Sequence, residues 1–315
     1  MEKSLETQLC ECLKKGYTKK ALYIVQLMRN NINTRFRGRS PLSWAKKFEN
    51  DDVAKALEEK GAIEDSISEK DAKKLGANLR HSAEQGDVEA IEMLVEEGAD
   101  VDDRGFNGVT PLMKATEAQC YGDVVINKLI ELGAEVDARD FHGKTALMYA
   151  VENRRIYFVK DLIKAGADVF AKDKGGRNLL HLACGCHNDH MVSEILKLGL
   201  DINAKDNSGN SALMTAIFNK DIMCFNVLMA GKPDLNQTNN AGNTYLMAAS
   251  RIGFLSGVVS LIEAGADVNM KNNEGKNAIS LAANDEIRRA IINTVKRKYQ
   301  NEPEKIVALG KDFEM

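Results

Sequence analysis

The chain has 315 residues, of which 44% are hydrophobic and 28% are charged, and its formal net charge at pH 7 is −3. A charge this close to neutral does not favour nucleic acid or an anionic membrane as the partner. No stretch approaches the ~20 apolar residues of a transmembrane helix, and the first residues lack the apolar core of a signal peptide. The six scattered cysteines predict reduced thiols in a cytoplasmic protein rather than a disulfide framework.

Residues 1–63 predict an N-terminal cap and the first helical units. Leu5 to Gly16 and Lys19 to Arg29 have the apolar spacing of a helical pair, and a second unit opens near Pro41. Residues 64–72 then form a seam or linker. Leu42 and Leu79, which hold the same position in their units, are 37 residues apart. Since Ser68 to Asp71 resembles a capping box, we expect the next helix to begin early, with either a bulging loop or a hinge at 64–67.

Residues 73–299 repeat with a period of 33. Turn glycines follow one another at 33 or 35 residues, and so do a leucine or isoleucine and an acidic residue in each unit. The glycines are Gly108, Gly143, Gly176, Gly209, Gly242 and Gly275. Two extra residues fall in the unit 106–140, and we expect them between its helices, in Ala118 to Gly122. Residues 300–315 form a short tail.

The unit 141–173 explains the period. Thr145 suits a helix N-cap, Leu147 and Ala150 share one helical face, and Gly166 follows the second helix. With this 33-residue period, the unit resembles an ankyrin repeat. The resemblance implies an all-α solenoid of about eight to nine helix-turn-helix units, with the turn tips on the concave side and a C-terminal cap.

Methionine replaces the family's usual histidine at Met113, Met148, Met214 and Met247, while His181 retains it. We expect these methionines to pack in the core. The segment from Cys184 to His190 holds two cysteines and two histidines, which is the donor set of a zinc site. Because Cys184 and Cys186 are two residues apart, a helix would point them to different faces. We therefore predict a buried Cys184, no metal and no cofactor, although the sequence alone leaves a metal open.

No catalytic motif is found, and the repeats leave no room for a catalytic domain, so we expect no enzyme. In the ankyrin family, partners are usually held by turn tips and by the inner face of each first helix. The tips of the middle repeats are basic, although the chain is slightly acidic, and they carry aromatics that we expect to be exposed, Phe106, Phe141 and Tyr149. The predicted partner-binding residues are Arg104, Phe106, Arg139, Phe141, His142, Lys144, Tyr149, Lys172, Lys174 and Arg177.

These features favour a monomeric protein-interaction scaffold or adaptor whose partner is another protein with an acidic, partly apolar segment. One alternative is a sensor that holds a small, nucleotide-like anion on the basic tips. Another is a secreted effector directed at a host. A protein partner needs several adjacent repeats, whereas a small ligand needs one or two.

Overall fold

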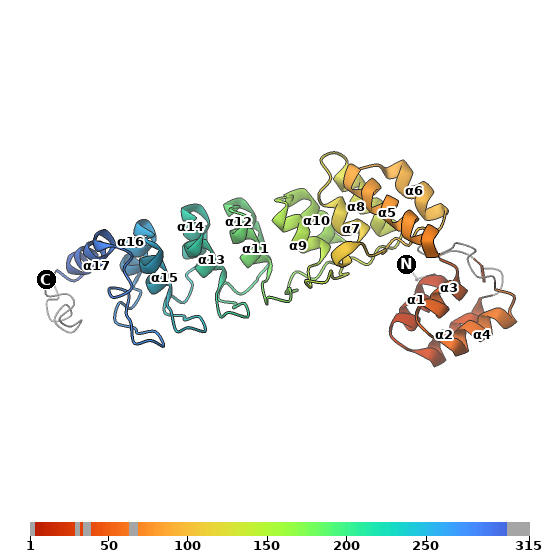
Figure 1. The fold of residues 1–315 in the computed structure, drawn as a ribbon, viewed down its shortest axis with the longest axis horizontal. Coiled ribbons are helices and arrows are strands. Elements are labelled where there is room, and N and C mark those ends of the chain that lie inside the picture. The colour runs from red at the N-terminus through yellow and green to blue at the C-terminus, as the bar shows by residue number, and fades with distance from the viewer. Residues whose placement is uncertain (1–3, 29–31, 34–38, 63–68, 301–315) are drawn as a thin grey trace. The chain divides into compact units, whose positions relative to one another are not determined.

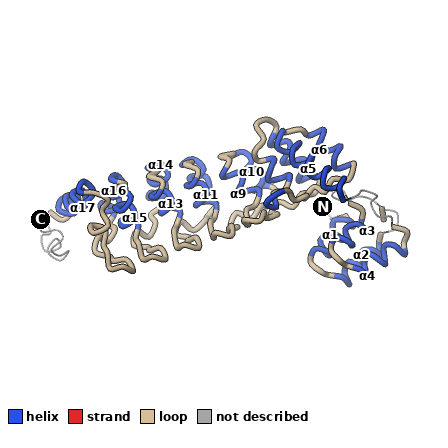
Figure 2. Tube along the Cα trace, viewed as in Figure 1, coloured by secondary structure: helices blue, strands red, loops and turns tan. Residues whose placement is uncertain are grey.

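The computed structural model describes residues 4–28, 32–33, 39–62 and 69–300. These ranges contain seventeen α-helices, one short 3-10 helix and no extended strand, which confirms the all-helical prediction (Figures 1 and 2). They form two compact units. Unit one comprises the described residues up to 141 together with 145–147 and 157–167, and unit two comprises 142–144, 148–156 and the described residues from 168 onward.

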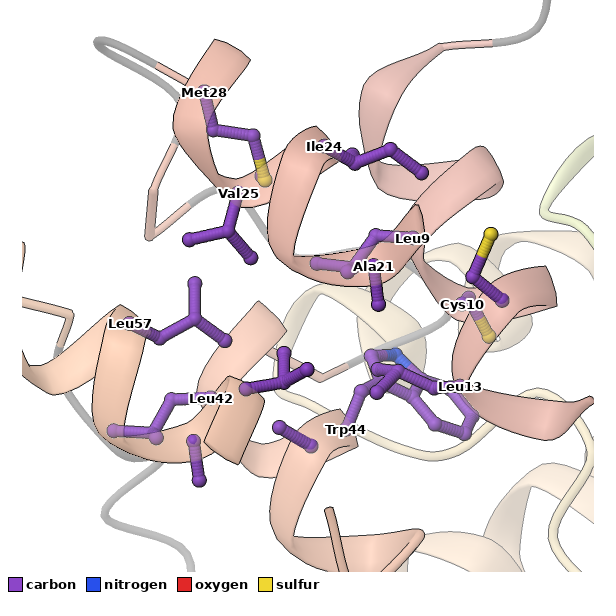
Figure 3. Close-up of a cluster of buried hydrophobic side chains, with 14 residues drawn as sticks. Leu9, Cys10, Leu13, Ala21, Ile24, Val25, Met28, Leu42, Trp44 and Leu57 are labelled. Atoms are coloured by element: carbon purple, nitrogen blue, oxygen red, sulfur yellow. The ribbon is translucent and has the colours of Figure 1, made fainter. Parts of the chain in front are cut away.

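The first four helices of unit one enclose a core of their own. They are α1 (Leu5–Lys14), α2 (Thr18–Leu27), α3 (Pro41–Lys47) and α4 (Asp51–Glu59). Ser4 and Ser40 cap α1 and α3 by accepting a hydrogen bond from the backbone three residues on. Side chains of all four helices meet in one buried cluster around Leu13, Trp44 and Leu57 (Figure 3).

The next helix, α5 (Glu69–Gln85), is 17 residues long, and its start at Glu69 confirms the early beginning expected from the capping-box pattern. Leu79 lies in its second half, whereas the equivalent Leu112 is the second residue of its own helix. The extra residues before Leu79 therefore extend a helix in place of a turn. The expected loop or hinge at 64–67 and nearly all of the predicted tail lie outside the described residues.

The remaining helices alternate in pairs with the expected rhythm. They are α6 (Val88–Glu96), α7 (Pro111–Ala115), α8 (Gly122–Glu131), α9 (Ala146–Glu152), α10 (Ile156–Lys164), α11 (Leu179–Gly185), α12 (Asp189–Leu196), α13 (Ala212–Phe218), α14 (Ile222–Ala230), α15 (Tyr245–Ile252), α16 (Leu255–Ala264) and α17 (Asp285–Lys298), with a 3-10 turn at Phe106–Gly108. The two extra residues of the unit 106–140 fall between α7 and α8, as expected. In unit two, the hairpin turns lie on one side of α11, α13 and α15 (Figure 1).

The capping and packing of the first helix of each pair follow the predicted pattern. Thr110, Ser211 and Thr244 each accept a hydrogen bond from the methionine three residues later. The four methionines at this position are 0–1% exposed, so their assignment to the core is confirmed. His181 instead bridges two repeats, because its Nδ1 lies 2.6 Å from Asn178 Oδ1 and its Nε2 lies 2.9 Å from the Asn210 carbonyl oxygen.

Candidate functional site

The turn tips of unit two are joined by a ladder of hydrogen bonds. The backbone N–H of Asn240 donates to the Ser208 carbonyl at 3.1 Å, and the Asn240 side-chain amide donates to the Asn207 carbonyl at 2.9 Å. Asn207 and Asn273 each make the same two contacts with the tip before their own. An asparagine at this position therefore ties its tip to the preceding one through both backbone and side chain.

Three earlier repeats carry a different side chain at the same position, two residues before the turn glycine. These residues are Phe106, Phe141 and Lys174. The backbone link is retained in unit one, where the Phe141 N–H donates to the Asn107 carbonyl at 2.7 Å. A phenyl ring has no amide to add the second link, and Phe106 and Phe141 are 92% and 60% exposed. In place of the linking asparagine, two of these repeats therefore present an exposed aromatic ring and the third presents an exposed lysine.

Unit one holds both rings and two predicted arginines on neighbouring turn tips. Arg104 and Arg139 are both exposed, and an Arg104 guanidinium N–H donates to the Arg139 carbonyl at 2.6 Å. The Phe141 ring lies against Gly108, where an added Cβ would lie 2.7 Å from the ring. Gly108 has φ +78, so glycine suits both the turn and the close approach of the ring. We define Arg104, Phe106, Arg139 and Phe141 as the aromatic tip group.

Unit two holds the other predicted residues, which we define as the basic tip group: His142, Lys144, Tyr149, Lys172, Lys174 and Arg177. Lys144 and Arg177 have carboxylate partners within the chain. Lys144 Nζ lies 2.7 Å from a Glu152 oxygen, and the Arg177 guanidinium lies 2.7 Å from the buried Asp173 carboxylate. The four-residue spacing of Asp173 and Arg177 was a signal for that pair, whereas Lys144 and Glu152 are eight residues apart.

Tyr149 corrects one detail of the prediction. We expected an exposed aromatic, but its side chain is only partly accessible. Lys144 Nζ lies 5.6 Å from the centre of its ring, which is within the range of a cation–π contact. By contrast, His142, Lys172 and Lys174 are exposed. Lys172 and Lys174 therefore present accessible positive charge on the turn tips.

Some of the basic tip residues also link neighbouring repeats. Lys172 Nζ lies 3.4 Å from the Lys205 carbonyl oxygen, and Lys205 Nζ lies 2.7 Å from that of Thr238. Arg104 makes the equivalent contact with Arg139 in unit one. Each of these contacts ties a basic tip residue to the next repeat and fixes its position.

Unit one also contains a cavity of about 590 Å³ beside Arg104. Trp44 and Phe48 form its apolar wall. The charged lining residues are the cations Lys14, Arg39, Lys47 and Arg104 and the carboxylates Asp100, Asp102, Asp103 and Glu135. Lys14 is paired with Glu135 at 2.7 Å, and Lys47 with Asp100. With equal numbers of cations and carboxylates, this cavity offers an anion no excess of positive charge.

The Cys184 segment has the arrangement expected from its sequence. Cys184 is fully buried, Cys186 caps the end of α11, and His190 lies in α12. A hydrogen bond with Cys224, together with burial, raises the pKa of the Cys184 thiol well above its ordinary value. None of the six cysteines forms a disulfide bond. In the described ranges, no three His, Cys, Asp or Glu side chains are grouped so that they could hold a metal ion.

Comparisons with known proteins agree with the fold. The family model described as ankyrin repeats (3 copies) matches residues 79–173 and 157–239, and that described as ankyrin repeat matches 241–273, so that together they cover more than half of the chain. A search of curated proteins found no match. None of the helices described above is both long and apolar enough to cross a membrane.

Two solved structures illustrate the likeness. The ankyrin repeat domain of Bcl-3, described as a unique member of the IkappaB protein family, is 27% identical with a TM-score of 0.60, and the match covers 68% of this chain and 97% of that one. The human ASB11 ankyrin repeat domain is 22% identical with a TM-score of 0.61, covering 69% and 96% respectively.

Proposed function

Because the chain belongs to the ankyrin-repeat family, we propose that it is a protein-binding scaffold or adaptor whose turn tips hold an acidic, partly apolar segment of another protein. Ankyrin repeats typically form non-catalytic interaction modules, and stacked repeats present extended binding surfaces. In this proposal the chain acts as a monomer in the cytoplasm, and its partner is a protein rather than a nucleic acid or a membrane.

The observation that carries the proposal is the replacement of the asparagine ladder in the middle repeats. Asn207, Asn240 and Asn273 use this tip position for a link between repeats. Phe141 cannot form the side-chain hydrogen bond to the preceding tip, and its large apolar ring is exposed to solvent. Exposed aromatic rings near arginine are typical anchors of protein interfaces, since they bury a large area at little cost in side-chain entropy.

The two tip groups are proposed to contribute differently. In the aromatic tip group, Phe106 and Phe141 bury apolar side chains of the partner, which slows dissociation. In the basic tip group, Lys172 and Lys174 attract the partner's carboxylates before contact, which speeds association. Lys144 and Arg177 already have carboxylate partners of their own, so a partner's acid gains less from them.

Alanine and charge-reversal variants test the proposal with a partner recovered by pull-down with the parent chain. We expect Phe106→Ala and Phe141→Ala each to weaken binding by up to about 2 kcal/mol, mainly through faster dissociation. Lys174→Glu should slow association and make it less dependent on salt. Binding kinetics at two salt concentrations measure both effects.

Matched controls lie on other exposed surfaces. Tyr157→Ala removes an aromatic that is 75% exposed, and Lys160→Glu reverses an exposed charge on the same helix, α10. Both should bind like the parent. If the tip variants remain folded by thermal melting and also bind like the parent, the tips are not the binding surface and the proposal is wrong.

A further inference from the structure

The stacking of helix pairs is interrupted at α5 and α6. In the first four helices α1 packs on α3 and α2 on α4, and in unit two α11 packs on α13 and α12 on α14. The pair α5 and α6 packs forward on α7 and α8, whereas none of the helices described before α5 packs extensively on either. One face of this pair therefore lacks the neighbour that the repeat pattern would supply.

The uncovered face contains an open depression of about 310 Å³. Its lining residues are Asn78, His81 and Ser82 from α5, Ala90, Met93 and Leu94 from α6, and Glu97. Met93 is 61% exposed, while Leu79 and Ile91 on the same helices are fully buried. The pair thus has one face packed in the repeat core and a second, partly apolar face that is open to solvent.

The α6 side of the depression is rich in carboxylates, whereas α5 carries the exposed lysines Lys73 and Lys74. The segment from Val88 to Glu97 carries four exposed glutamates and no lysine or arginine. One of them, Glu92, is paired with Lys128 of α8 at 2.8 Å. Two of them, Glu96 and Glu97, lie at the C-terminal end of α6, where the helix dipole disfavours negative charge. A ligand that brings positive charge to Glu97 would offset this unfavourable interaction with the helix dipole.

The helix that precedes this pair, α4, carries one exposed lysine, Lys55, against four carboxylates. Asp51, Asp52, Glu58 and Glu59 of α4 are all exposed. Stacking α4 on α6, as the repeat pattern would require, would bring two acidic surfaces together. Like charges at close range are unfavourable, so the chain's own α4 is a poor occupant of the face.

We propose that the α5/α6 face is a second docking surface, separate from the turn tips, and that it binds a basic amphipathic helix of a partner protein. The apolar stripe of that helix packs on Ala90, Met93 and Leu94. Its lysines or arginines lie against Glu97 and the neighbouring glutamates. Recognition of an amphipathic helix in a groove follows from apolar side chains repeating one turn apart on the ligand.

A designed peptide tests this surface on the full chain. The probe is a fluorescent helical peptide of about 15 residues with a leucine stripe and lysines on its other faces, and its counterpart carries glutamate in place of each lysine. Anisotropy should show binding of the lysine peptide and not of the glutamate peptide. Met93→Lys should weaken binding by about tenfold or more, since it removes an apolar contact and adds a like charge.

The control is Met223→Lys, which makes the same change of charge at a methionine that is 59% exposed on α14. It should bind the lysine peptide like the parent. Equal binding by the parent and Met93→Lys, or no binding by the parent, overturns the proposal. Sedimentation adds one further outcome. If the parent is a dimer and Met93→Lys is a monomer, the face pairs with a second copy, and the proposal of a basic partner helix is also wrong.

Discussion

At the scale of single residues, the tip position two residues before the turn glycine holds either an asparagine that links neighbouring repeats or an exposed side chain. Asn207, Asn240 and Asn273 each add an amide hydrogen bond of 2.8–3.0 Å to the preceding tip. Phe141 and Lys174 occupy the equivalent positions and are exposed. The sequence identifies which residues occupy these positions. It does not reveal the amide link, because that link depends on how closely neighbouring tips approach one another.

His181 provides a pH-dependent test at this scale. Burial lowers its pKa, the Asn210 carbonyl and Asp206 act in the opposite direction, and the nearby Lys172 and Arg177 reinforce the lowering. The unfolded chain therefore takes up this proton at a higher pH than the folded chain. The stability associated with neutral His181 is fully present above its ordinary pKa of about 6.5 and is lost as the pH falls below that value.

His181→Met supplies the matching variant, because four other repeats carry methionine at this position. We expect the melting temperature of the parent to fall further than that of the variant when the pH is lowered from about 7.5 to about 5. An equal fall in both proteins would show that His181 does not contribute to the acid sensitivity.

At the scale of elements, the connection between the two helices of a repeat has a recurring strained residue. Glu49, Arg154, His187 and Lys220 all have φ between 51° and 59°. Gly86 and Gly253 occupy the equivalent position in two other repeats, with φ of 82° and 71°. A left-handed backbone costs a residue with a Cβ about 1 kcal/mol relative to glycine.

Lys220→Gly should therefore stabilise the protein, by about 1 kcal/mol. Lys160→Gly is the matched control, because Lys160 lies inside α10, where glycine costs about 1 kcal/mol. Urea unfolding of both variants measures the two effects. If Lys220→Gly lowers the stability as Lys160→Gly does, Lys220 is not strained in this connection.

The sequence predicted these elements unequally well. The 33-residue period set the order of the helices from α7 onward, because each unit repeats the same apolar and glycine positions. The early start of α5 was predicted from Ser68 to Asp71, but not that a helix would replace the turn before Leu79. The partial burial of Tyr149 and its approach to Lys144 depend on tertiary packing. The position of a residue within the repeat does not predict such packing.

At the scale of the whole molecule, the repeats differ in role although they share one architecture. The later repeats retain a continuous asparagine ladder, which favours a stable stack. The middle repeats carry the exposed aromatic and basic tips, and the α5/α6 pair has an open acidic face. The proposed binding surfaces lie at the positions where a repeat differs from its neighbours. These differences lower the stability of the stack.

Phe141→Asn tests this central claim most directly, because it replaces the proposed contact residue with the residue of the structural ladder. The new amide should reach the Phe106 carbonyl in unit one and add about 1 kcal/mol of stability, while removing the aromatic contact with the partner. We predict a melting temperature equal to or above that of the parent, together with weaker binding of the recovered partner. A variant that binds as tightly as the parent, or that binds less only because it has lost stability, would contradict the account.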